Sequence, residues 1–375
     1  MKHASLFVLV AFVACGTLPG TTMAAAPHAY ANSISAHNIG AMQHTIMTNA
    51  IHTFEGTASA ALGTRSNILM PGDKDATEQT LKKNPADEYG HLPLYGTMHL
   101  YGEYGDDGSV YGHNGGDMVS RPTINSMWLN WQHVGDNASF DNFETTDSDY
   151  DVITFGISGG DVQMGTGITD WGMFGGYVGG TQDNSAINID ENGGYVGLYG
   201  GYTLGGFNIS LAADAGALYN RATHGAGTDE YANMFVGGAI NATYNIALDA
   251  TFTLQPGVYA GYTWVKSANY MSMDGTAIAN NNLNLFEVAP GARAIKHIGS
   301  GWFGFIGAKY VFNFEHGGDA TAAGARLADL ETANYSEYGL GLEKSIDRFY
   351  MSIKLGRRDG GRTGWTWGTS LKYMF

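Results

Sequence analysis

The sequence predicts an all-β protein: a closed, up-and-down barrel of 12 antiparallel strands that spans a membrane, with an N-terminal helix in or near the pore. From about residue 125 onward, hydrophobic residues recur at every second position, in segments separated by clusters of Gly, Asn, Asp and Thr. Charged residues fall almost entirely on one face of each segment, and the apolar faces end in aromatic residues. Twelve such segments can be placed, and each has room for a tilted strand of about ten residues with its connection.

The composition excludes several other classes of protein. The chain has 375 residues, of which 55 are Gly, 8 are Pro and one is Cys, and only 14% are charged. A single cysteine excludes a disulfide framework. Abundant aromatic and branched residues argue against disorder. The formal net charge of -16 makes nucleic acid a poor partner, because phosphate binding needs clustered Lys and Arg.

The first 24 residues predict a cleaved export signal. Met1–His3 is a short basic start, Ala4–Cys15 is apolar, and Thr22–Ala24 offers a cleavage site between small residues. The apolar stretch is too short to span a bilayer as a helix. Residues 12–15 form a loose lipoprotein box, which we keep as the alternative. After ordinary cleavage the mature chain would contain no cysteine, which suits an oxidising compartment.

Residues 25–94 form a short N-terminal region in which a helix is predicted from about Ser33 to Ala60. Ser33 or Ser35 would cap its start, and Pro71-Gly72 ends any helical run. The apolar residues of this helix follow a spacing of three and four: Ile39, Met42, Ile46, Ala50 and Phe54. This segment is either a helix in the pore, a helix on the surface, or a loosely ordered periplasmic tail.

The segment between this helix and the barrel is less regular. Asp73–Glu88 is polar, charged and typical of a linker. Residues 95–124 are a β extension or a further linker, since Leu94–Tyr104 alternates again. A hairpin here would raise the strand count to 14, whereas a small extension outside the membrane would leave it at 12. Residues 125–375 are the predicted barrel.

Alternation assigns a direction to each side chain of the predicted strands. In Trp302–Glu315, Trp302, Ile306 and Phe314 share the apolar face, and Lys309 lies on the opposite one. A charge facing lipid near the membrane midplane costs about 2–4 kcal/mol, so the charged positions should face the lumen. The predicted pore-lining residues are Glu287, Arg293, Lys309, Glu315, Glu337, Glu343, Lys354, Arg358 and Lys372.

From residue 125 onward the chain resembles the β-domain of autotransporters, the type V secretion family. The resemblance lies in an ordered series: Ser126–Asn130, Tyr150–Asp161, Phe174–Tyr177, Leu198–Tyr202, Leu254–Pro256 with Gly261–Thr263, Gly339–Glu343, and a last strand ending in Phe375. It implies a 12-stranded barrel with a helix in the pore leading to a secreted passenger. The last strand looks like those that the barrel-assembly machinery of Gram-negative bacteria recognises, here through Trp367, Leu371, Tyr373 and Phe375.

The sequence departs from that family at its front end and in its chemistry. Only Ala25–Ile124 precede the barrel, without an internal repeat, where passengers commonly have hundreds of residues. Some members of the family cleave their own passenger inside the barrel, using an Asn or an acidic residue near the pore helix. No Asn pair occurs in Ser33–Ala60, and Asn49 alone is a faint echo, so we expect no self-cleavage.

Catalytic and metal-binding motifs are sparse. No Gly-x-Ser-x-Gly, Walker loop, His-Glu-x-x-His or Cys pair occurs. His37 and His44 lie on nearly one helix face, but no adjacent carboxylate or cysteine completes a metal site, so a polar face is the preferred interpretation. Four Asp/Asn-rich stretches are interpreted as solvated loops: Asp136-Asn137, Asp147–Asp151, Asp183-Asn184 and Asp190–Asn192. We therefore predict no enzyme activity, no cofactor and no bound metal.

The predicted function is that of an autotransporter-type barrel of the bacterial outer membrane, which anchors and translocates or displays a short N-terminal segment. The alternatives are a small porin-like channel plugged by its N-terminal helix, and an adhesin acting through acidic extracellular loops. The expected partners are outer-membrane lipid and lipopolysaccharide, with the barrel-assembly machinery and the Sec translocon during biogenesis. The chain is expected to be a monomer.

Overall fold

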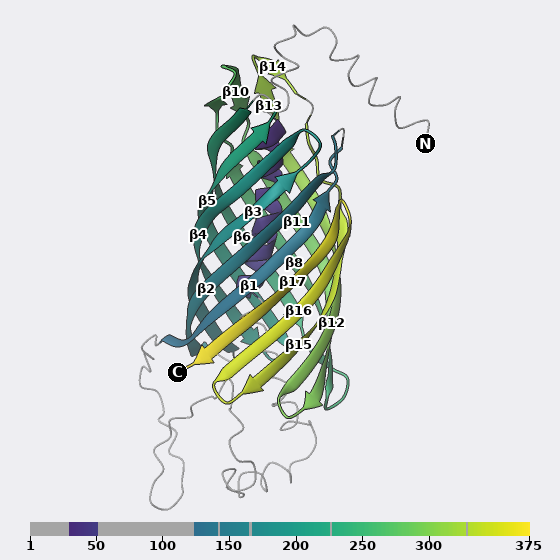
Figure 1. The fold of residues 1–375 in the computed structure, drawn as a ribbon. Coiled ribbons are helices and arrows are strands. Elements are labelled where there is room, and N and C mark those ends of the chain that lie inside the picture. Colours follow the sequence, from purple (N-terminus) through teal and green to yellow (C-terminus); the bar gives the residue numbers. More distant parts are fainter. Residues whose placement is uncertain (1–29, 52–123, 142, 165–166, 226, 328) are drawn as a thin grey trace, which may run out of the picture.

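A computed structural model of the chain describes residues 30–51 and 124–375, except residues 142, 165–166, 226 and 328. Twelve long antiparallel strands close into a barrel, and a helix at residues 30–51 lies inside it (Figure 1). The predicted fold class is therefore confirmed, including the position of the helix in the pore. The predicted export signal, the continuation of the helix to Ala60 and the linker at Asp73–Glu88 lie outside the described residues.

Each of the 12 predicted segments corresponds to one spanning strand, and each spanning strand pairs with its neighbours in the chain. The closing pair joins the first strand to the last, with Trp128 opposite Lys372. The spanning strands are β1 (Ile124–Ala138), β2 (Thr146–Met164), β3 (Gly167–Asp183), β4 (Ile187–Leu204), β5 (Phe207–His224), β6 (Gly227–Tyr244), β8 (Phe252–Lys266), β11 (Leu283–Gly299), β12 (Trp302–Gly317), β15 (Tyr335–Ile346), β16 (Phe349–Gly360) and β17 (Arg362–Met374).

The two ends of the barrel differ. At the end that holds Ile124 and the C-terminus, here called the turn end, two-residue turns join β4 to β5, β11 to β12 and β15 to β16. Their first residues, Gly205, Ser300 and Asp347, have φ values of 58°, 49° and 48°, which tight hairpin turns require. At the opposite loop end, the connections after β8 and β12 form a second sheet from β9 (Tyr270–Met271), β10 (Ala277–Asn280), β13 (Ala320–Ala322) and β14 (Ala325–Arg326). The remaining short strand, β7 (Ile246–Ala247), pairs with β8.

The outer wall of the barrel is apolar, as alternation predicts. On β12, Ile306 is 63% exposed on the outside, whereas Val311 on the inner face is fully buried. On β16, Ile353 is 68% exposed, while Arg358 is buried. In a membrane these outward side chains contact lipid instead of water.

Glycines on the inner face give room to large aromatic side chains. The Trp128 ring covers Gly156 of the next strand, and a Cβ atom at Gly156 would lie 2.4 Å from it. Tyr199 covers Gly172 in the same way. The rings therefore lie flat along the wall, which explains part of the high glycine content and leaves the centre of the lumen to the helix.

The lumen helix (residues 30–51) is buried on every side, although it carries both apolar and polar residues. It includes Tyr30, so the predicted caps are wrong: Ser33 and Ser35 lie inside the helix. Their hydroxyls instead donate to Gly318 O at 2.6 Å and to Asn220 Oδ1 at 2.9 Å, because both face the barrel wall. No helix in the described part of the chain is long and apolar enough to cross a membrane.

The predicted Asp/Asn-rich loops are a second correction. Asp136-Asn137, Asp147–Asp151 and Asp190–Asn192 lie within β1, β2 and β4, and Asp183 ends β3, leaving only Asn184 in a connection. The strands have 12 to 19 residues instead of about ten, because they continue past the apolar band at the loop end. Beyond that band polar residues also occupy the outer face, so the composition of these strand ends resembles that of a loop.

Candidate functional site

The lumen helix enters at the loop end and reaches the middle of the barrel. Near its start, Asn32 Nδ2 donates to Ala268 O at 2.7 Å in the connection after β8. Near its described end, Asn49 Oδ1 accepts a hydrogen bond of 2.7 Å from Lys354 Nζ on β16. The helix therefore runs along the barrel axis with its N-terminal end at the loop end.

On one side, the amides of the helix bind buried carboxylates of the wall. Asn38 Nδ2 donates to Glu191 Oε2 on β4 at 2.9 Å, and Gln43 Nε2 donates to Asp214 on β5. Both carboxylates are nearly inaccessible to solvent. An unpartnered buried carboxylate is costly, so these amide contacts fix the helix against β4 and β5.

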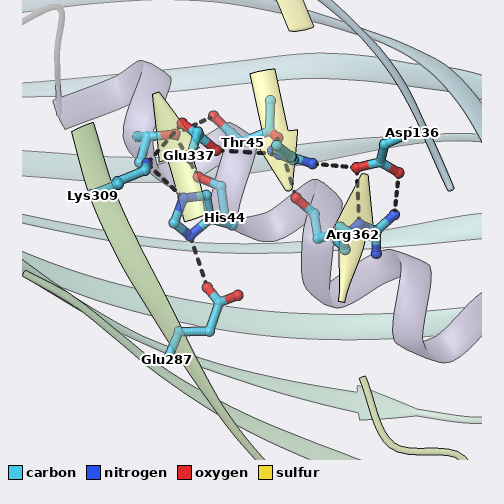
Figure 2. A network of polar contacts seen from close by, with 10 residues as sticks. His44, Thr45, Asp136, Glu287, Lys309, Glu337 and Arg362 are labelled. Atoms are coloured by element: carbon cyan, nitrogen blue, oxygen red, sulfur yellow. Dashed lines mark hydrogen bonds and ion pairs between the residues drawn. The ribbon is translucent and has the colours of Figure 1, made fainter. Parts of the chain in front are cut away.

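Two histidines of the helix contact two more carboxylates, and their hydrogen bonds indicate different charges. His37 Nδ1 donates to Ser33 O at 2.7 Å while Nε2 lies 3.3 Å from Glu315 Oε2, and the nearby carboxylate favours the protonated, cationic ring. His44 Nδ1 donates to Glu287 Oε2 at 2.9 Å. Its Nε2 accepts from Lys309 Nζ at 2.9 Å, so this ring is neutral (Figure 2).

On the other side, a buried cluster of opposite charges contacts the helix (Figure 2). Asp136 on β1 pairs with Arg358 Nη1 at 2.8 Å and with Arg362 Nη2 at 2.8 Å. Arg362 Nη2 also donates to Asn38 Oδ1 at 3.1 Å, and Arg358 Nη2 donates to Thr45 Oγ1 at 3.4 Å. Each guanidinium thus joins the wall to the helix while Asp136 balances part of their charge.

Further pairs line the wall between these two sides. Glu337 accepts from Lys309 Nζ at 3.0 Å and from Arg358 Nε at 3.2 Å. Arg293 on β11 pairs with Glu343 on β15 and lies 3.9 Å over the Phe305 ring. The helix itself has no Asp, Glu, Lys or Arg, so it is a polar, nearly uncharged body between carboxylates and cations of the wall.

The structure places all nine predicted pore-lining residues on the inner face of the barrel. Lys309, Glu287, Glu315, Lys354 and Arg358 contact the helix directly. Glu337, Arg293 and Glu343 pair with other wall residues, and Lys372 borders the space below the helix.

Sequence reasoning missed several charged residues of the lumen, among them Asp136, Arg362, Asp214 and Glu191. Asp136 and Arg362 are buried on the inner face. Asp136 is two residues after the inward-facing Val134 on β1, so the alternation of that strand could have identified it as a lumen residue. Asp214 lies in phase with Ala212 on β5 in the same way. Glu191 is harder to find, because the inner face of β4 near it is apolar. There the apolar face of the strand no longer marks the outside of the barrel.

Below the helix, the half of the lumen toward the turn end holds a cavity of about 240 Å³. Thr48 and Ile51 of the helix form its upper boundary. Within the described residues, no group of three or more His, Cys, Asp or Glu side chains could hold a metal ion. His37 and His44 each face a separate wall carboxylate instead of a shared site.

The last strand presents its alternate residues to the outside. On β17, Trp367 and Leu371 are exposed, and Tyr373 is half-buried beside Phe349; Phe375, which follows the strand, is also exposed. The terminal residue is tied to the first strand, since Phe375 N donates to Asn125 O at 2.9 Å. Recognition of these four residues by an assembly machinery stays a prediction.

A closed barrel with an apolar outer wall, a charged lumen and both barrel termini at the turn end defines an outer-membrane β-barrel protein. The family described as autotransporter beta-domain matches residues 127–371. The chain therefore belongs to the autotransporter β-domain family.

Solved structures share this fold. The transport unit of the autotransporter AIDA-I from Escherichia coli is 18% identical with a TM-score of 0.57, over 69% of this chain and 93% of that one. The β-domain of the Bordetella autotransporter Brka is 13% identical with a TM-score of 0.55, over 68% and 100%. The translocator domain of NalP from Neisseria meningitidis is 13% identical with a TM-score of 0.53, over 67% and 89%. No curated protein matches the sequence.

Proposed function

We propose that this outer-membrane barrel carries its own N-terminal segment outward through the lumen, keeps the lumen helix as a plug, and has no enzyme activity. The observation that carries the proposal is the fit of the helix: its amides, imidazoles and hydroxyls bind charges on opposite walls. Asn38 alone contacts Glu191 on one side and Arg362 on the other. A helix held from both sides supports a retained plug and disfavours a permanently open porin-like channel.

The orientation of the helix supports outward transport. In outer-membrane barrels the short turns are periplasmic and the longer connections extracellular. The loop end of this barrel is therefore its outer end, and the lumen helix begins there. The part of the chain before Tyr30 would then emerge at the cell surface, where the predicted mature start at Ala25 would leave only a short displayed segment.

The two described residues that flank residues 52–123 support a complementary proposal. Ile51 borders the cavity in the turn-end half of the lumen, and Ile124 begins β1 at the turn end itself. A connection between these two points has its shortest route on the periplasmic side. We place residues 52–123 there, and residues 70–100 would then be inaccessible from outside the cell.

Two epitope tags test this arrangement, one inserted after Ala26 and one between residues 76 and 77. The proposal expects antibody binding to the first tag on intact cells and to the second only after the outer membrane is permeabilised. Two further strains, each with one of the tags in an exposed turn-end loop, control for the permeability of the outer membrane. Surface labelling of the second tag in intact cells, with none of the first, would contradict the proposal.

The partners of the chain follow from this function as proposals. Export through the Sec translocon would require the predicted signal at residues 1–24. Insertion by the barrel-assembly machinery would use β17, whose outward residues and terminal Phe375 lie at the closing seam with β1. Lipid and lipopolysaccharide would surround the apolar outer wall.

A further inference from the structure

Several wall side chains that bind the lumen helix are long and flexible. Lys309, Lys354 and Arg358 reach helix atoms from the ends of extended aliphatic stems. Such side chains can follow a helix that shifts by a few ångströms along the barrel axis. These contacts therefore hold the helix in the lumen without fixing its axial position closely.

Asp214 on β5 makes a contact of a different kind, because its side chain is short. It accepts a hydrogen bond from Gln43 Nε2, and Gln43 is the only side chain among the described residues that donates to it. Asp214 is 6% exposed and Gln43 is 1% exposed. A helix displaced by one turn, about 5.4 Å, would leave this buried carboxyl group without its side-chain donor, which is costly.

The backbone of the neighbouring strand makes room for the same amide. Gly237 on β6 lies directly opposite Asp214 in the register of the sheet. A Cβ atom at Gly237 would collide with Gln43 Nε2 and would lie 3.0 Å from Asp214 Oδ1. The amide of Gln43 therefore occupies a space that any other residue at this position would fill. We call this space, bounded by Asp214 and Gly237, the Gln43 seat.

The wall offers no equivalent space on the loop-end side of the Gln43 seat. The preceding inner-face residue of β6 is Phe235, which is 3% exposed. Its ring covers Gly216, the next inner-face residue of β5 toward the loop end, where an added Cβ atom would collide with the ring. A Gln43 amide that moved outward would therefore meet an aromatic ring instead of a carboxyl group.

From these observations we infer that the Gln43 seat is the stop that ends outward transport with residues 30–51 in the lumen. This inference rests on the proposed function and names the residues that set its end point. A chain moving toward the loop end would halt where the amide of Gln43 reaches Asp214 beside Gly237. Asp214 and Gly237 are thus positioning residues of the barrel.

The test uses disulfides that report the axial position of the helix. In the seated helix a Cβ atom at Gly40 would lie 4.0 Å from Leu285 Cβ on β11. Leu283 is the next inner-face residue of β11 toward the loop end, so it should become the partner of residue 40 after outward displacement. The two reporter proteins are Gly40→Cys/Leu285→Cys and Gly40→Cys/Leu283→Cys.

Each reporter receives one of two changes that empty the seat. Gln43→Ala removes the amide, and Gly237→Ala fills the space it occupies. The matched control on the strand is Gly238→Ala, which faces outward and whose added Cβ atom would lie no closer than 3.8 Å to a neighbour, Ala212 O. The control on the helix is Thr48→Ala, because the Thr48 hydroxyl donates to carbonyls of the helix itself. Heat-modified gel mobility verifies folding.

We expect cross-linking at Leu285 in the wild type and in both controls. In Gln43→Ala and Gly237→Ala, the ratio of cross-linking at Leu283 to that at Leu285 should rise about tenfold, as expected for the loss of one hydrogen bond to a carboxylate.

Two results would overturn the stop while transport itself stands, as judged by surface exposure of the tag after Ala26. One is an unchanged ratio in both seat variants, and the other is an equal rise in the controls. Absence of that tag from the surface of cells carrying the wild-type barrel would instead contradict the proposed function, and the stop with it.

Discussion

Asp136 is the single residue on which most contacts between the barrel seam and the lumen helix depend. It lies on β1, and the guanidinium groups of Arg358 and Arg362 that it pairs with come from the last two strands. Both guanidiniums also reach the helix, through Thr45 and Asn38. All three charged side chains are at most 2% exposed, so the cluster acts where water cannot screen it.

Replacing Asp136 by Asn should therefore destabilise the folded barrel strongly. The substitution keeps the shape but leaves two buried guanidiniums without their shared counter-ion, a loss of about 3–5 kcal/mol in buried pairs. Urea unfolding in detergent measures the change in the free energy of unfolding. Asp149→Asn is the control, because Asp149 is 67% exposed on the outer face of β2. Equal effects of the two substitutions would contradict the role given to Asp136.

The facing of β12 gives a second prediction at the residue scale. Ile306→Lys should impair assembly in the membrane, since a lysine facing lipid costs about 2–4 kcal/mol. Lys309→Ala should leave assembly intact, because this position faces the lumen and loses only contacts with His44 and Glu337. The yield of the heat-modifiable form on gels compares the two. Equal yields would mean that the facing of β12 is wrong.

At the scale of elements, the lumen helix is unusual in being buried all round while half of its residues are polar. Burial of that many polar groups is tolerated only when each finds a partner. Here many of the partners are charged groups of the wall, and two of them, Glu315 and Glu287, face histidines of the helix. The contact at His37 holds the outer end of the helix, and the contact at His44 holds its middle.

The charged state of His37 predicts that the helix loosens at alkaline pH. The protonated ring is the form that binds Glu315, so the stabilisation is present at low pH and is lost as the pH rises through the titration of His37 in the folded protein. Protease sensitivity of the helix should increase as the pH rises above the ordinary pKa of histidine, about 6.5. His37→Gln should remove this dependence, because an amide donates to Glu315 without titrating. The same pH response in both proteins would contradict the assignment.

At the scale of the whole molecule, most of the fold could be predicted from alternation, because side chains that face lipid must be apolar and charged side chains must therefore face the lumen. All 12 spanning strands follow from it. Their length could not be predicted, since past the apolar band the constraint ends and Asp147–Asp151 looks like a loop. The pore-lining charges could be predicted where the outer face of a strand is apolar because it contacts lipid. Glu191 could not be predicted, because the inner face beside it is apolar as well. Which wall residues contact the helix depends on the position of the helix along the barrel axis, and no periodicity in the sequence specifies that position.

The central claim, that residues 30–51 occupy the lumen, is tested most directly by a disulfide between the helix and the wall. A Cβ atom at Gly40 would lie 4.0 Å from Leu285 Cβ on β11, within the range for an unstrained disulfide. We predict that a Gly40→Cys/Leu285→Cys protein forms this bond in cells, seen as a reduction-sensitive shift of the denatured chain on gels. Gly40→Cys/Ile240→Cys, whose second site is on the outer face of β6, should not. No cross-link in the first pair, or equal cross-linking in both, would contradict the account.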